Sequence, residues 1–81
     1  NEVVPLAQLR ECVDGYVTDI LRCAPLAVRA TKAVAMRGLD LPLPEAYQTT
    51  YAAETLRRAS ADAAEGPKAF TEKRPPKWQG K

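Results

Sequence analysis

The sequence predicts an all-α fold made of three longer helices and one short C-terminal helix. Apolar residues recur at spacings of three and four, which is the pattern of a helix that buries one face. Prolines stand where the helices are expected to begin, and the first helical turn tolerates a proline because its N–H groups have no partner inside the helix. No strong strand pattern is found, so no β-strand is expected.

The first helix is expected from about Pro5 to Cys23, after a short connector formed by residues 1–4. At 100° per residue, its apolar side chains fall within an arc of about 80°. They form one stripe, made of Leu6, Leu9, Val13, Val17, Ile20 and Ala24. Such a stripe predicts that this helix packs against a larger apolar surface.

Two further helices are expected in the middle of the chain. One should span about Pro25–Arg37, with Gly38 in the left-handed conformation just beyond its end. The other should span about Pro44–Ala59. Its Tyr47 and Tyr51 are four residues apart, so they are expected to form a ridge on one helix face.

The end of the chain is expected to be punctuated by glycine and proline. Ser60 is a plausible N-cap for a short helical turn through Glu65. Gly66 and Pro67 should break that turn, and a last helix should begin at Pro67 and run to about Arg74. The residues that follow show no periodicity.

Length and charge narrow the possible classes of protein. A chain of 81 residues is one domain at most, and an isolated core of this size is marginal. Because the first residue is Asn1, we expect the chain to be part of a longer protein. The net charge is only +2, but residues 68–81 contain five basic residues and one acidic residue. No apolar run approaches the ~20 residues needed to span a bilayer.

The two cysteines are expected to be reduced. Cys12 and Cys23 are eleven residues apart, which on one straight helix separates them by about 16 Å along the axis. A disulfide needs Cα atoms within about 7 Å of each other. We therefore interpret both as packing residues of a cytoplasmic protein.

The residues that commonly carry chemistry are sparse. There is no histidine, and no metal-ligand set, nucleophile motif or phosphate-cradling loop is found. The basic tail has two interpretations. It is either a solvated end with Trp78 against a neighbouring surface, or an anion site. In the second case Phe70 and Lys73 share one helix face and, with Arg74, meet an adenine ring and a phosphate.

Four stretches, in this order and spacing, resemble the C-terminal segment of the enoyl-CoA hydratase/isomerase (crotonase) superfamily. They read NEVVP at residues 1–5, APLAVRATK at 24–32, SADAAEG at 60–66 and AFTEKRPPKWQGK at 69–81. Each motif is weak alone, but together they cover essentially the whole chain. Pro67 departs from the apolar helix former of many relatives and is reminiscent of the carnitinyl-CoA dehydratase branch.

The resemblance implies a parent enzyme with an α/β spiral fold that acts on acyl-CoA thioesters. Hydration, dehydration or isomerisation of an enoyl-CoA would be its typical reaction. Upstream residues would supply an oxyanion hole for the enolate and one or two carboxylates for proton transfer. Residues 1–4 would then end the connector from the catalytic core, and no catalytic residue or metal ligand is expected in this chain.

The resemblance also implies a role for this segment itself. Residues 5–81 would form the C-terminal helical segment that builds a trimer or hexamer and acts as a lid. Phe70 and Lys73 match the positions that complete the acyl-CoA pocket, so they are the expected coenzyme-contacting residues. The fragment alone would bind no cofactor, and coenzyme A would enter as the thioester substrate of the parent.

Two other functions remain open at this stage. A free-standing helical interaction or nucleic-acid-binding module would use the basic tail and Trp78, and its binding should weaken steeply with salt. A carrier protein is disfavoured, because no serine stands at a helix start in an Asp-Ser-Leu context.

Overall fold

The computed structural model describes all of residues 1–81, and every regular element in it is helical. A 3₁₀ turn precedes the first of five α-helices. The elements are the turn Leu6–Gln8, α1 (Leu9–Leu21), α2 (Pro25–Gly38), α3 (Leu43–Gln48), α4 (Ala52–Arg58) and α5 (Ala61–Thr71). The predicted all-α class is confirmed. None of these helices is both long and apolar enough to cross a membrane.

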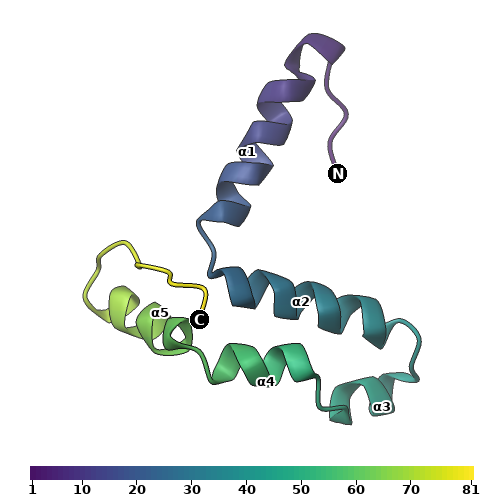
Figure 1. Cartoon of the computed structure of the whole chain (residues 1–81). Coiled ribbons are helices and arrows are strands. Elements are labelled where there is room, and N and C mark those ends of the chain that lie inside the picture. The colour runs from purple at the N-terminus through teal and green to yellow at the C-terminus, as the bar shows by residue number, and fades with distance from the viewer.

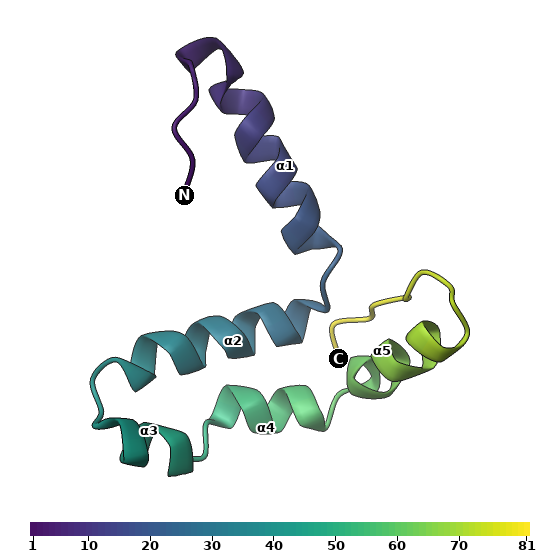
Figure 2. The same ribbon diagram turned by 180° about the vertical axis from the view of Figure 1, so that it is seen from behind.

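The chain has an open, angular shape rather than a compact one (Figure 1). Helix α1 projects away from the rest, and α2 lies beside α4 with α3 at the turn between them. Figure 2 shows the same arrangement from behind, with α5 and the C-terminal residues near the elbow between α1 and α2. The radius of gyration is 16.0 Å, whereas a compact chain of this length would have about 12 Å.

Helix α2 begins as predicted but ends differently. Ala24 is extended, with ψ at 125°, and Pro25 occupies the first turn. The expected left-handed Gly38 is wrong, because Gly38 is the last residue of α2 and its φ is not positive. The chain leaves the helix through two turn hydrogen bonds instead, from Asp40 N to Arg37 O and from Leu41 N to Gly38 O.

The predicted single helix at 44–59 is wrong, since α3 and α4 are separated by residues 49–51. Thr49 and Tyr51 are extended, and the Tyr51 hydroxyl donates to the carbonyl of Ala46 at 3.0 Å. That bond folds the chain back at the break. The tyrosine ridge is also wrong, because Tyr51 is buried whereas Tyr47 is 91% exposed.

Helix α5 is continuous where two separate helical pieces were predicted, so it begins earlier than the expected start at Pro67. Ser60 is the N-cap as expected, and its hydroxyl accepts from the N–H of Ala63. The expected break at Gly66–Pro67 does not occur, and the helix continues to Thr71 rather than Arg74. Contacts from the tail on both sides of Pro67, described below, stabilise the continuous helix.

The fold leaves most apolar side chains in solvent. Only four hydrophobic residues are buried, and they are Leu26, Ala30, Tyr51 and Ala69. The predicted stripe on α1 is bare, with Val13 and Val17 each 46% exposed and Ile20 54% exposed. The accessible surface is 6946 Å², against about 4,800 Å² for a compact protein of this mass. The chain therefore buries far too little apolar surface to form a core of its own.

Candidate functional site

After α5 the chain reverses and runs back along the helix, as Figure 1 shows. Lys73 makes the reversal with a φ of 52°, in the left-handed region that glycine usually occupies. Its N–H donates to Phe70 O, and the N–H of Arg74 donates to Ala69 O. These two bonds close a Schellman motif at the helix end.

The structure places the two predicted coenzyme-contacting residues on different elements. Phe70 lies in the last turn of α5 with 87% of its surface exposed. Lys73 lies in the reversal, exposed, and forms no ion pair within the chain. The expectation that both share one helix face is wrong, because α5 ends before Lys73. The main-chain bond between them nevertheless keeps the two residues adjacent.

Arg74, predicted to meet a phosphate, is occupied inside the chain. Its guanidinium binds both carboxylate oxygens of Glu65, at 2.6 and 3.0 Å, and also binds Glu72. The Arg74 hydrogen bonds, followed by the N–H of Lys77, lower the pKa of Glu65 to about 2. The two carboxylates raise the pKa of Arg74 above its ordinary value. Arg74 is thus part of the scaffold and not a free anion ligand.

Asp62, in the first turn of α5, holds the far end of the tail. The residue is 4% exposed, and its carboxylate accepts hydrogen bonds from Gln79 N at 2.7 Å and Gly80 N at 2.9 Å. Gly80 has a φ of 70°, which suits glycine and aims its N–H at the carboxylate. The N–H of Ala61 donates to the main-chain oxygen of Lys81 at 2.8 Å.

Trp78 links the tail to the elbow of the molecule. Its indole N–H donates to the carbonyl of Arg22 at 2.8 Å, just beyond α1. Its ring lies over Gly66, where an added Cβ would come within 3.4 Å of the indole. The Trp78 contacts agree with the first interpretation of the tail, which places this ring against a neighbouring surface, although the tail is also hydrogen-bonded to α5. The hydrogen bonds of Asp62, Glu65 and Trp78 were not anticipated, and the only available signal was the spacing of three between the two carboxylates.

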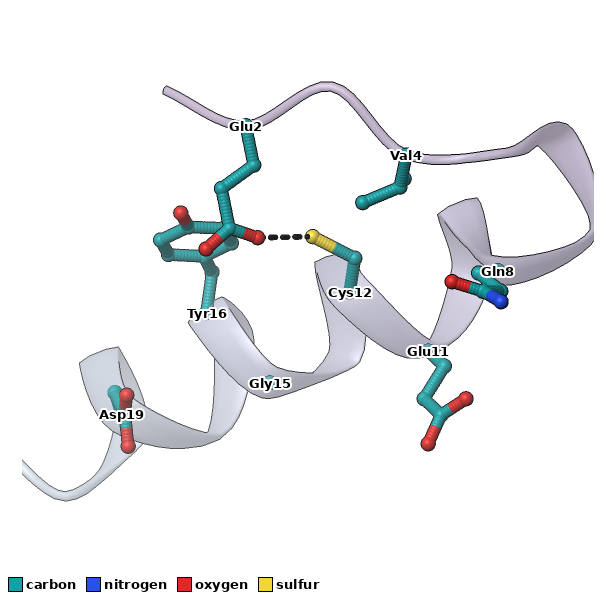
Figure 3. A pocket seen from close by; sticks show the side chains of 8 residues that line it. All are labelled: Glu2, Val4, Gln8, Glu11, Cys12, Gly15, Tyr16 and Asp19. Atoms are coloured by element: carbon teal, nitrogen blue, oxygen red, sulfur yellow. Dashed lines mark hydrogen bonds between the residues drawn. The ribbon is translucent and has the colours of Figure 1, made fainter.

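A second feature is a hollow of about 480 Å³ between residues 1–4 and α1 (Figure 3). The thiol of Cys12 donates to the carboxylate of Glu2 at 3.1 Å, and this bond is the main reason why the pKa of Cys12 is raised. A thiol held in its protonated form is a poor nucleophile. Both cysteines are free, and the Glu2 carboxylate beside Cys12 favours the protonated thiol rather than the thiolate.

Comparison with known proteins decides the family. The family model described as enoyl-CoA hydratase/isomerase matches residues 1–81. The chain belongs to the enoyl-CoA hydratase/isomerase family. The resemblance in the four sequence motifs, and membership of the crotonase superfamily, are thereby confirmed.

Three similar proteins illustrate the match. The chain is 35% identical to (E)-benzylidenesuccinyl-CoA hydratase of Thauera aromatica, covering 99% of this chain and 31% of the relative. It is 34% identical to carnitinyl-CoA dehydratase of Escherichia coli, covering 100% of this chain and 33% of the relative. A crystal structure of an enoyl-CoA hydratase/isomerase from Mycobacterium paratuberculosis superposes with a TM-score of 0.86 at 42% identity, covering 99% of this chain and 32% of that one.

The chain therefore spans about one third of the length of the relatives it matches. The names of these relatives describe enzymes that act on CoA thioesters. The part of the crotonase-fold structures that aligns with this chain is limited to this helical segment.

Proposed function

We propose that this chain is the C-terminal helical segment of an enzyme that hydrates, dehydrates or isomerises enoyl-CoA thioesters, as a lyase or isomerase of fatty acid metabolism. Residues upstream of the segment would stabilise the thioester enolate and move protons. Residues 1–4 connect to that catalytic core, and residues 5–81 serve assembly and close the coenzyme pocket. The family match over the whole chain is the observation that carries this proposal.

The assembly role is supported by the surface that the segment leaves uncovered. Its accessible surface exceeds that of a compact chain of the same mass by about 2,100 Å². A standard protein interface covers about 800 Å² on each partner. The excess is therefore enough for contact both with the upstream core and with sister subunits in a trimer or hexamer. The bare stripe on α1 is an apolar part of this uncovered surface.

The coenzyme role is supported by two features of the reversal. Phe70 offers an exposed flat ring for stacking against an adenine, and Lys73 offers an unpaired ammonium for a phosphate. Lys73 also occupies a left-handed position where glycine would be less strained. A lysine at such a position is consistent with a function of its side chain rather than of its backbone.

The test uses the full-length enzyme with two substrates, an acyl-CoA and the matching acyl-pantetheine, which lacks the nucleotide. Lys73→Gly keeps the left-handed turn and removes the ammonium. We expect KM for acyl-CoA to rise about tenfold, because one charge-assisted hydrogen bond is lost. KM for acyl-pantetheine should not change. Lys68→Ala, which removes an exposed lysine of α5, is the matched control. An equal effect on both substrates would contradict the coenzyme contact.

The nucleic-acid-binding alternative gains nothing from the geometry. Arg74 is held by two carboxylates, and the Trp78 indole N–H is bonded to the main chain. Two of the groups that such a module would use are therefore already occupied within the segment.

A further inference from the structure

One face of α5 is matched residue by residue to the tail. Asp62, Glu65, Gly66 and Ala69 follow spacings of three and four, so they lie on one side of the helix. The tail runs back along this face toward the start of α5. Arg74 bonds Glu65 and the carbonyl of Ala69, and the N–H of Lys77 also bonds Glu65. Trp78 lies over Gly66, and Gln79 and Gly80 bond Asp62. We call this set of contacts the tail clasp.

The clasp is anchored by carboxylates that need the tail in place. Asp62 is 4% exposed and forms no ion pair, so its charge is stabilised by the two main-chain N–H groups of Gln79 and Gly80. Glu65 accepts from Arg74 and from the N–H of Lys77 at the middle of the tail. If the tail leaves, both carboxylates exchange these charge-assisted hydrogen bonds for water at the same time, because all of the partners lie in residues 74–80. The clasp should therefore open as a unit.

The clasp acts directly on the reversal at Lys73. A lysine in the left-handed region is strained, and its conformation persists only when the surroundings fix it. Here the next residue, Arg74, is tied to α5 by its side chain and its N–H. Trp78 in turn ties the tail to the carbonyl of Arg22, so the clasp also fixes α5 against the elbow. The clasp therefore fixes the positions of both Phe70, on α5, and Lys73, in the reversal.

We propose that Asp62 and Glu65 are positioning residues, which hold the tail so that Lys73 and Phe70 are presented to the nucleotide end of an acyl-CoA. This inference rests on the coenzyme contact proposed above, and it adds residues that do not touch the substrate themselves. The matched control is Glu54, a carboxylate of α4 that is paired with Arg57 and Arg58 and bonds no residue of the tail.

The test compares Asp62→Asn, Glu65→Gln and Glu54→Gln in the full-length enzyme. Amide exchange of Lys77, Gln79 and Gly80 reports whether the tail has opened. For Asp62→Asn and Glu65→Gln we expect exchange at these amides to accelerate by about tenfold or more, equivalent to one lost charged hydrogen bond. KM for acyl-CoA should rise about three- to tenfold with kcat within about twofold, and acyl-pantetheine should be unaffected. Glu54→Gln should change none of these.

A double variant separates this inference from the coenzyme contact. Where Lys73 has been replaced by glycine, Asp62→Asn should raise KM no further, because the group that it positions is gone. If Lys73→Gly alone leaves KM unchanged, the coenzyme contact fails and the inference fails with it.

Two other results would overturn the positioning role alone. In the first, Lys73→Gly raises KM, but carboxylate variants with an opened tail leave KM unchanged. In the second, the carboxylate variants leave the tail closed. Should Asp62→Asn fail to fold, Glu65→Gln and Trp78→Phe decide by the same criteria. Trp78→Phe keeps an aromatic ring at this position, but it loses the bond to Arg22 and the outer ring atoms that lie over Gly66.

Discussion

Helices α1 and α5 have similar lengths, 13 and 11 residues, but they are stabilised in different ways. α1 has no buried residue and leaves its apolar stripe bare, whereas α5 is bound along one face by the tail clasp. An isolated helix of about a dozen residues is marginal in water. The comparison therefore separates a part that depends on another body, α1, from a part that is fixed within the segment, α5 with its tail.

The largest effect should come from placing a charge in the bare stripe. Val17→Asp would put a carboxylate where α1 is proposed to meet the core or a sister subunit, and burying such a charge costs several kcal/mol. We expect the full-length enzyme to lose its assembled state, measured by light scattering after size exclusion. Thr18→Asp, one residue along on the same helix, should leave assembly intact. An assembled Val17→Asp enzyme would show that the stripe is not an interface.

The next largest effect concerns the link between the two parts. Trp78→Ala removes a half-buried ring over Gly66 and the bond to Arg22. We expect about 2–3 kcal/mol of destabilisation in urea unfolding. Trp78→Phe should cost less, about 1–2 kcal/mol, because it loses one hydrogen bond and the outer ring atoms but keeps the rest of the ring. Equal costs for both variants would mean that the inner part of the ring contributes nothing to holding the tail.

A pH dependence should distinguish the clasp from the stripe. The pKa of Glu65 is lowered to about 2 in the folded chain from an ordinary value of 4.5. Its contribution is therefore fully present above pH 4.5 and is lost as the pH falls toward 2. Exchange of the Lys77 amide, corrected for its intrinsic rate, should accelerate over this window.

The Glu65→Gln variant is the control for that titration. It should show an exposed tail at all pH values, with no transition between pH 4.5 and 2 at Lys77. A transition of unchanged size in this variant would assign the effect to another carboxylate.

The smallest effect is expected for Lys73→Gly, which should change the stability of the fold and the binding of acyl-CoA in opposite directions. Lys73→Gly relieves a left-handed lysine and should stabilise the fold by up to about 1 kcal/mol, while weakening acyl-CoA binding as described above. Thermal unfolding and KM measured on the same preparation check both. A destabilised Lys73→Gly enzyme would mean that the lysine side chain packs rather than binds.

The sequence predicts the features that depend on near neighbours. The start of α2, the cap at Ser60 and the stripe on α1 all follow from residues within a turn or two. The break at residues 49–51 does not, because it depends on Tyr51 reaching back to Ala46. The continuous α5 also escapes prediction, since Glu65 meets Lys77 twelve residues later. The first helix is expected to begin at Pro5, but α1 begins at Leu9 after a 3₁₀ turn. Phe70 and Lys73 are one of two interpretations of the basic tail, and the family resemblance favours them as coenzyme contacts. For the carboxylates that hold the tail, the sequence offers only their spacing of three.

Amide hydrogen exchange, measured on residues 1–81 alone and on the same residues within the full-length enzyme, tests the central comparison most directly. The account predicts that α1 exchanges almost freely in the isolated chain and is strongly protected in the full-length enzyme. The amides of Gln79 and Gly80 should keep a larger share of their protection in isolation, because Asp62 holds them within the segment. A monomeric isolated chain in which α1 is as well protected as in the enzyme would contradict it.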